Sequence, residues 1–223
     1  MDYRVISIGT IAEHELWPDQ GPPRTAHATT TLIRDTGRVI LVDPGLPPQV
    51  IAARLRERSG LATTAVTDVF LTNFRPEHRW GLAAFEHAKW WIAEQERERV
   101  GAMLIERFKA EDDAATRQLV QQDVAILQRC AAAPDKLAPH VDLFPLPGYT
   151  PGTCGLLLPL PRSTTLIAGD AVASVEHLEQ GKVLRGAFDE RQAQESLVEA
   201  LEIADVIVPG YDNAVPNVTR RPF

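Results

Sequence analysis

The sequence predicts an α/β fold in which two β-sheets pack back to back and helices cover their outer faces. Segments with strand patterns are followed by segments with helix patterns, and this order occurs once in each half of the chain. A length of 223 residues suits one large domain with a sizeable core. We therefore expect a single domain over residues 1–223.

The chain starts with strand patterns. Apolar residues predict strands over 3–8, 29–34 and 38–42, and Asp35-Thr36-Gly37 predicts a hairpin turn between the last two. The segment 13–25 contains several Pro and Gly residues, which favour a loop. Its position before the hairpin lets this loop overhang a site formed at the strand ends.

The next elements alternate between helix and strand. Helical spacing of apolar residues over 49–59 predicts an amphipathic helix that ends at Gly60. A strand over 65–71, a short helix over 82–86 and a buried strand over 88–93 follow. These elements complete the first strand-and-helix half.

A helical insertion is expected at about residues 94–131, where good helix formers predominate. It divides into helices over 94–108 and 112–131. The sequence does not decide whether this insertion caps the site or forms a dimer surface. Strand patterns then return over 141–144, 153–160, 164–168, 182–185 and 204–208, with a helix over 189–203 that Asp189 caps.

Composition argues against several classes of function. The formal net charge is −7 and no basic patch is visible, which argues against nucleic-acid binding. The N-terminus lacks the features of a signal peptide and the apolar runs are too short to span a membrane, so we expect a cytoplasmic protein. Cys130 and Cys154 have no metal-site or disulfide spacing and are interpreted as buried thiols.

Five segments carry a family resemblance. The first, at residues 71–81, reads LTNFRPEHRWG and resembles the L-T-H-x-H-x-D-H-x-G element of the metallo-β-lactamase superfamily. The other four resemble further elements of that family in the same order, and they are Ile40–Gly45, Gly148–Gly152, Leu166–Asp170 and Val208–Asp212. The resemblance implies a four-layer αββα sandwich, here with a helical insertion.

The family's metal-binding positions are mostly substituted in this chain. The two early His and the Asp-His pair of the family hold one or two zinc ions, and the corresponding residues here are Asn73, Arg75, Glu77 and His78. Two further ligand positions, normally His, carry tyrosine. The former metal-site positions are thus Asn73, Arg75, Glu77, His78, Tyr149, Asp170 and Tyr211, with Asp43 supporting them from behind.

These substitutions predict a degenerate dinuclear zinc site. Hydrolytic zinc needs neutral imidazoles and carboxylates, and most of the expected imidazoles are absent. Arg75 cannot bind a metal, and it can replace the lost cation by bridging two carboxylates, while Tyr149 and Tyr211 act as hydroxyl donors. We therefore expect no zinc-dependent hydrolysis of the usual kind and no cofactor. On this interpretation the groove is retained for a small-molecule ligand or a partner, either a second copy or a paralogue.

The alternative is a hydrolase with one metal ion. Glu77, His78, Asp170 and Tyr211 are all capable ligands, and their mixture of carboxylate, imidazole and phenol suits Fe or Mn better than Zn. Asp43, Glu77 and Asp170 would then be the catalytic candidates. The substrate would be an ester, lactone, thioester or phosphoester.

Other His and Trp residues are weaker candidates. His27 precedes a predicted strand, and Trp80 with Trp17 could line a pocket at the mouth of the site. His87 is expected to pack beside the short helix. We expect the remaining three to lie on the surface, and these are His14, His140 and His177.

Overall fold

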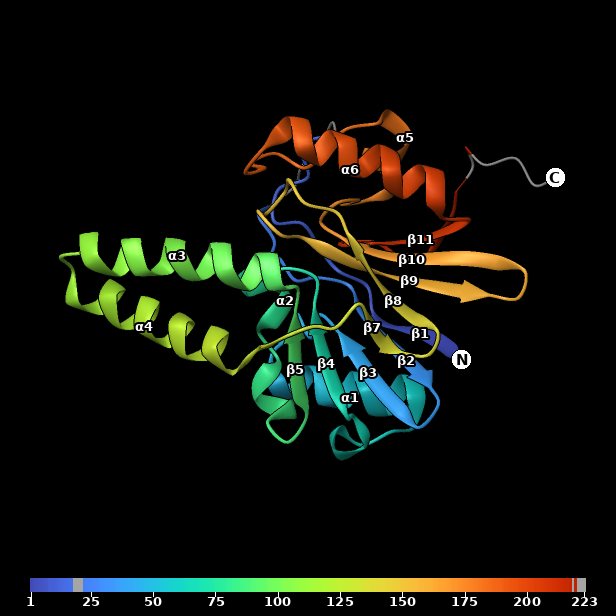
Figure 1. The fold of residues 1–223 in the computed structure, drawn as a ribbon, viewed down its shortest axis with the longest axis horizontal. Coiled ribbons are helices and arrows are strands. Elements are labelled where there is room, and N and C mark those ends of the chain that lie inside the picture. Colours follow the sequence, from blue (N-terminus) through green and yellow to red (C-terminus); the bar gives the residue numbers. More distant parts are fainter. Residues whose placement is uncertain (18–21, 218, 220–223) are drawn as a thin grey trace.

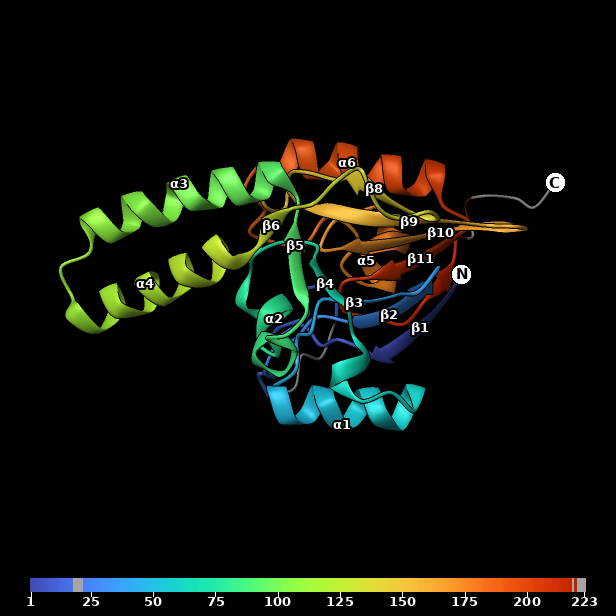
Figure 2. The ribbon, with the colours of Figure 1, turned by 60° about the horizontal axis from the view of Figure 1, so that its bottom comes forward.

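The computed structural model describes residues 1–17, 22–217 and 219 and contains two six-stranded sheets. The strand order is β1-β2-β3-β4-β5-β6 in one sheet and β12-β11-β10-β9-β8-β7 in the other. Figures 1 and 2 show the sheets face to face, with α1 and α6 on opposite outer sides. The predicted two-sheet fold with outer helices is therefore confirmed.

The first sheet combines an antiparallel and a parallel part. β1 (Asp2–Ser7), β2 (Thr30–Asp35) and β3 (Arg38–Val42) are antiparallel, as the hairpin pattern predicted. Thr36 and Gly37 make the hairpin turn with φ angles of 45° and 81°. The parallel strands that continue the sheet are β4 (Asp68–Leu71), β5 (Lys89–Ile92) and β6 (Ala131–Ala132).

The second sheet is antiparallel except between β10 and β11. Its strands are β7 (Lys136–Ala138), β8 (Val141–Pro145), β9 (Cys154–Leu160), β10 (Ser163–Gly169), β11 (Val206–Pro209) and β12 (Val215–Pro216). Apolar residues from both sheets fill the space between them, among them Ile40, Phe70, Leu156 and Ile167, none more than 2% exposed. This core holds the strand ends of the two sheets at one common edge.

Helices cover the outer faces through apolar stripes. α1 (Pro48–Ser59) buries Ile51 and Leu55 against the first sheet, and α6 (Glu190–Ile203) buries Leu197 and Ala200 against the second. Asp189 caps α6 as predicted, because its side chain accepts the Gln192 N–H. The short elements are η1 (Thr63–Ala65), α2 (Pro76–Arg79), η2 (Leu82–Phe85) and α5 (Val175–Gln180). In the described part of the chain, no helix has the length and apolar character needed to cross a membrane.

The predicted helical insertion is an antiparallel hairpin of α3 (Glu94–Ala110) and α4 (Ala114–Arg129). It projects from the side of the sandwich in both ribbon views (Figures 1 and 2). The strand predicted over 182–185 is wrong. That segment is irregular, because Gly181 at a φ of 61° ends α5 and the Lys182 N–H bonds the His177 carbonyl at 2.9 Å.

Candidate functional site

The candidate site lies where strands of the two sheets end. Asp43 follows β3, while Thr72 and Asn73 follow β4. From the other sheet, Asp170 follows β10 and Tyr211 lies just beyond β11. Parallel neighbours end at the same edge of a sheet, so these residues converge although they lie far apart in the sequence.

The loop after β3 is shaped to present a carboxylate. Asp43 has a φ of 49°, a left-handed conformation that Asp tolerates better than most residues. Its carboxylate accepts the Thr72 N–H at 2.8 Å and the Thr72 hydroxyl at 2.7 Å. The strand end at Gly169 packs directly on the same threonine, since a Cβ there would meet Thr72 Oγ1 at 2.5 Å. Thr72 therefore joins both sheets behind the site.

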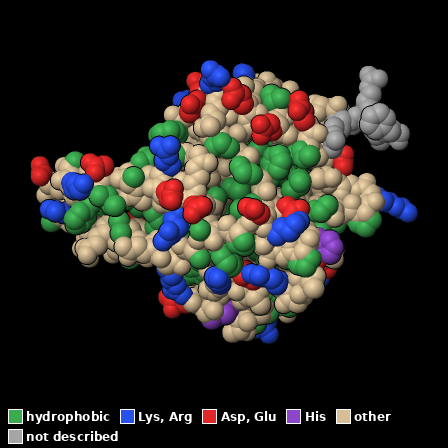
Figure 3. Space-filling model, in the orientation of Figure 1, with side chains coloured by type: hydrophobic (Ala, Val, Ile, Leu, Met, Phe, Trp, Pro, Cys, Tyr) green, Lys and Arg blue, Asp and Glu red, His purple; other side chains and the backbone are tan. Residues whose placement is uncertain are grey.

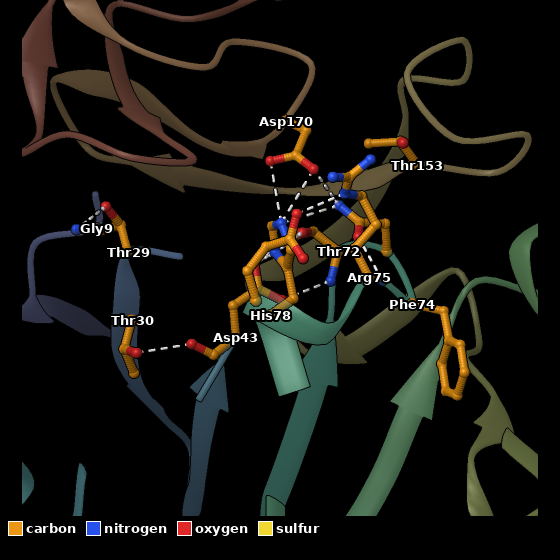
Figure 4. Close-up of polar contacts among 12 residues, drawn as sticks. Gly9, Thr29, Thr30, Asp43, Thr72, Phe74, Arg75, His78, Thr153 and Asp170 are labelled. Atoms are coloured by element: carbon orange, nitrogen blue, oxygen red, sulfur yellow. Dashed lines mark hydrogen bonds and ion pairs between the residues drawn. The ribbon is translucent and has the colours of Figure 1, made fainter. Parts of the chain in front are cut away.

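His78 lies at the centre, between two carboxylates (Figure 4). Its Nδ1 lies 3.0 Å from Asp43 Oδ2 and its Nε2 lies 3.0 Å from Asp170 Oδ1. The imidazole is fully buried, and burial lowers its pKa, but the charges of Asp170 and Asp43 raise that pKa well above the ordinary value. Burial raises the pKa of Asp170, but His78, with smaller effects of Arg75 and Tyr211, lowers it more, so that the net shift is downward. The geometry is that of an imidazolium held between carboxylates.

The Asn73 amide lies beside this cluster and is fully buried. Its Oδ1 accepts the Arg75 N–H at 2.9 Å, which fixes the amide orientation. Its Nδ2 therefore faces the cluster, 3.0 Å from Asp170 Oδ2 and 3.3 Å from His78 Nε2. An amide N–H is a hydrogen-bond donor, so Asn73 offers no lone pair to the space it faces.

Arg75 lies at the rim. Its Nε donates to Glu77 Oε1 at 2.6 Å and its Cζ lies 5.1 Å from the centroid of the Tyr149 ring. Its side chain is 42% exposed. The expectation that Arg75 bridges two carboxylates is wrong, because Glu77 is the one carboxylate it pairs with among the described residues. α2 starts at Pro76, directly after Arg75. The Arg75 side chain therefore lies at the rim of the site, whereas His78, in the first turn of α2, points into the buried cluster.

The two tyrosines that replace family histidines are buried, protonated phenols. Burial and the charge of Asp170 raise the pKa of Tyr211 well above its ordinary value, and they raise that of Tyr149 as well. The Tyr211 ring stands edge-on to His78, with centroids 6.1 Å apart. Both hydroxyls can therefore donate hydrogen bonds at neutral pH.

The loops of the site are fixed by Glu96, a residue for which the sequence gave no functional signal. Glu96 lies in the first turn of α3 and is fully buried. Its carboxylate accepts the N–H groups of Phe74 at 3.0 Å and Gly152 at 2.8 Å, and the Thr150 hydroxyl at 2.8 Å. Burial raises its pKa. An acidic residue at a helix start is ordinary in sequence, so only the packing reveals this link between two loops.

A groove of about 560 Å³ opens in front of the site. Arg75, Glu77, Tyr149 and Tyr211 line its inner wall. Apolar and charged residues of the 11–15 segment and of Leu184–Arg185 form the outer wall. The described part of the predicted 13–25 loop thus overhangs the groove, whereas residues 18–21 lie outside the described part of the chain.

A second polar cluster fastens that outer wall to α5. Ser174 Oγ lies 3.0 Å from His14 Nε2 and 2.8 Å from His177 Nδ1. His177 Nε2 lies 3.4 Å from Glu15, and Glu176 lies 3.2 Å from His14. The prediction that His14 and His177 lie on the surface is wrong, since they are 6% and 0% exposed.

The remaining candidates lie away from the groove. His27 forms a backbone bridge with Thr10, and Trp80 is 51% exposed; neither lines the groove. Trp17 stacks on His14 instead, with centroids 4.4 Å apart. His87 contacts the Val66 carbonyl at 3.1 Å, and His140 is on the surface as predicted.

The described side chains do not fit a metal as they are arranged. Within residues 1–17, 22–217 and 219, no group of three or more His, Cys, Asp or Glu side chains could hold an ion. Both nitrogens of His78 face carboxylates, and Glu77 is paired with Arg75. Cys130 and Cys154 are buried free thiols, as predicted.

Comparison with solved structures gives the same fold. A protein from Thermotoga maritima, provisionally named a metallo-beta-lactamase, superposes with a TM-score of 0.68 at 16% identity, over 96% of this chain and 98% of that one. A mutant of AiiA from B. thuringiensis, with N-decanoyl-L-homoserine bound at the active site, gives a TM-score of 0.64 at 16% identity, over 94% of this chain and 92% of that one. AidC, a dizinc quorum-quenching lactonase, gives 0.64 at 19% identity, over 79% and 68%.

A match between the sequence and a protein-family model shows the family of this chain. No curated protein matches the chain. The model of the Metallo-beta-lactamase superfamily matches residues 24–210, a range that includes Asp43, Asn73, His78 and Asp170 of the candidate site. The chain therefore belongs to the metallo-β-lactamase superfamily.

Proposed function

We propose that this protein has lost dinuclear zinc chemistry and uses the groove to bind a small organic anion. The observation that carries the proposal is the position of His78 between Asp43 and Asp170, with the Asn73 amide beside it. These four side chains satisfy one another by hydrogen bonds and opposite charges. A bound metal would have to displace that network.

Charge at the rim supports the same proposal. Arg75 keeps its charge at any physiological pH and reaches the groove next to Glu77. Two like unit charges about 4 Å apart repel by about 4 kcal/mol at an effective dielectric constant of 20, and a divalent ion doubles that repulsion. The Arg75 guanidinium therefore opposes a cation, and attracts an anion, in the part of the groove that it reaches.

The groove offers donors and an apolar surface. Arg75 bonds Glu77 through Nε, and its terminal Nη atoms have no hydrogen-bond partner among the described residues. The protonated hydroxyl of Tyr149 lies on the same wall, opposite apolar Ile11 and Leu184, while the hydroxyl of Tyr211 is hydrogen-bonded to Asp170. This combination suits a carboxylate or phosphate attached to an apolar group.

N-decanoyl-L-homoserine is a rational first probe. It is the molecule bound at the active site of AiiA, and its name specifies a carboxylate and a long acyl chain. We expect it to bind the present protein in titration calorimetry. Arg75→Gln should weaken binding about tenfold, since it removes a charge-assisted hydrogen bond. Arg34→Gln is the matched control, because Arg34 pairs with Asp2 on the surface.

Metal analysis separates this proposal from its alternative. Protein purified without chelator and then supplemented with Fe, Mn and Zn should retain far less than one ion per chain. Stoichiometric metal would overturn the proposal and favour a mononuclear hydrolase of esters, lactones, thioesters or phosphoesters. His78, Asp170 and Tyr211 are neighbours, so they would be the first ligands to test in that case.

A further inference from the structure

The hairpin of α3 and α4 has one packed face and one open face. Val100, Leu104 and Phe108 of α3 belong to the same apolar cluster as Val120 and Leu127 of α4. The opposite side of α3 is exposed, and the hairpin stands clear of the sandwich in both ribbon views (Figures 1 and 2). This open face is independent of the groove and of any ligand.

The open face carries a stripe of residues at helical spacing. Arg99, Ala102, Met103 and Glu106 are all exposed, and Ala102 and Met103 each lie three or four residues from Arg99 and Glu106, opposite the packed side. Met103 is a large apolar side chain that is 51% exposed. Figure 3 shows hydrophobic side chains and charges of both signs together on the projecting arm.

The charges on this face are antisymmetric about the middle of the helix. Arg99 precedes the midpoint between Ala102 and Met103, and Glu106 follows it. Reversal of the helix about that midpoint exchanges position 99 with 106. The exchange brings an acidic residue opposite a basic one.

We propose that the open face of α3 binds the same face of a second copy, with the two helices antiparallel about a two-fold axis between Ala102 and Met103. In that register Arg99 lies opposite Glu106 of the second copy, and the symmetry repeats the pair. A parallel register would place Arg99 opposite another Arg99. The charge pattern thus selects a second copy of this chain and its direction.

The expected dimer is weak and depends on concentration. A single helix pair buries less surface than the about 1,200 Å² or more of a stable interface. Lys109 also contacts Glu106 within the chain at 2.9 Å, and that surface pair competes with the intermolecular one. Sedimentation equilibrium over a concentration series should show a monomer–dimer equilibrium that shifts toward monomer at high salt.

Charge reversal tests the register. Arg99→Glu and Glu106→Arg should each weaken the dimer about tenfold, since each change turns two attractions into repulsions. The double variant R99E/E106R should restore dimerisation. Arg54→Glu on α1 is the matched control. Arg54, like Arg99, is an exposed helical arginine, and its partner Glu57 lies in its own helix. A wild type that stays monomeric, a dimer insensitive to the single changes, or a folded double variant that stays monomeric would overturn the proposal.

Cross-linking gives an independent readout. The native thiols of Cys130 and Cys154 are buried, so an engineered surface cysteine can be followed by itself. Met103→Cys lies next to the proposed axis and should form an intermolecular disulfide quickly when a thiol oxidant such as diamide is added. Ile105→Cys is equally exposed but lies off the stripe, and should cross-link more slowly. Equal rates would contradict the proposed register.

Discussion

The Nε2 atom of His78 lies 3.0 Å from Oδ1 of Asp170, and both side chains are buried. Loss of the imidazole would leave a buried carboxylate without its cationic partner. We therefore expect His78→Gln to lower the free energy of unfolding by about 3–5 kcal/mol. Urea denaturation measures this change.

A neutral pair offers the matched comparison. His78→Gln combined with Asp170→Asn removes both charges, so the double variant should be more stable than the single His78→Gln variant. If the single variant unfolds at the wild-type urea concentration, His78 does not neutralise this cluster.

Restored histidines should create a zinc site. Asn73→His with Arg75→His supplies two imidazoles and removes the rim cation, so we expect measurable zinc affinity by calorimetry. Arg75→His alone is the control and should bind much less. Zinc affinity in the double variant no greater than in this control, with native circular dichroism, would show that the backbone as well as the ligand set has diverged.

Glu96 should control both the stability and the ligand affinity of the groove. Glu96→Ala leaves the buried N–H groups of Phe74 and Gly152 without an acceptor, so we expect a loss of about 2–4 kcal/mol in the free energy of unfolding. Binding of N-decanoyl-L-homoserine should weaken as well, because Arg75 follows Phe74 directly. Gln95→Ala, at the exposed neighbouring position, should change neither quantity.

Acid should destabilise the wall of the groove. Burial raises the pKa of Glu176, but hydrogen bonds from Trp17 and Ser174 lower it more, to about 2 from the ordinary 4.5. A depressed acidic pKa stabilises the folded state above pH 4.5, and this contribution is lost as the pH falls toward 2. The stability difference between wild type and Glu176→Gln should therefore shrink across that range.

Thermal unfolding at several pH values measures this difference. Glu179→Gln is the control, since Glu179 lies exposed on the same helix. A difference between wild type and Glu176→Gln that stays constant down to pH 2 would contradict the assignment.

Much of the fold was predictable because short-range patterns specify it. The turn at Thr36-Gly37, the Asp189 cap and the helical hairpin each rest on local spacing, and the structure has all three. The prediction of a strand over 182–185 was wrong, because a short apolar run does not specify a strand unless another strand pairs with it. The five family segments also predicted where the site lies, because they keep the family's order along the chain although most metal-binding residues differ.

The arrangement inside the site was less predictable. His14 and His177 meet only because the 11–17 segment crosses to α5, and no local pattern records that contact. The sequence predicted that Arg75 would lie between the carboxylates, whereas in the structure the imidazole of His78 lies between Asp43 and Asp170. The side-chain direction at Arg75 and His78 depends on the turn that Pro76 starts, which residue types alone do not reveal.

Through Glu96, the projecting hairpin also stabilises two loops of the sandwich. The residue sits at the root of α3, yet the main-chain amides it holds belong to the rim of the groove. Deletion of the hairpin would therefore also remove the hydrogen bonds that Glu96 makes to these two loops. In hydrogen exchange, the Phe74 and Gly152 amides should therefore be protected in the full-length protein and exchange rapidly after such a deletion.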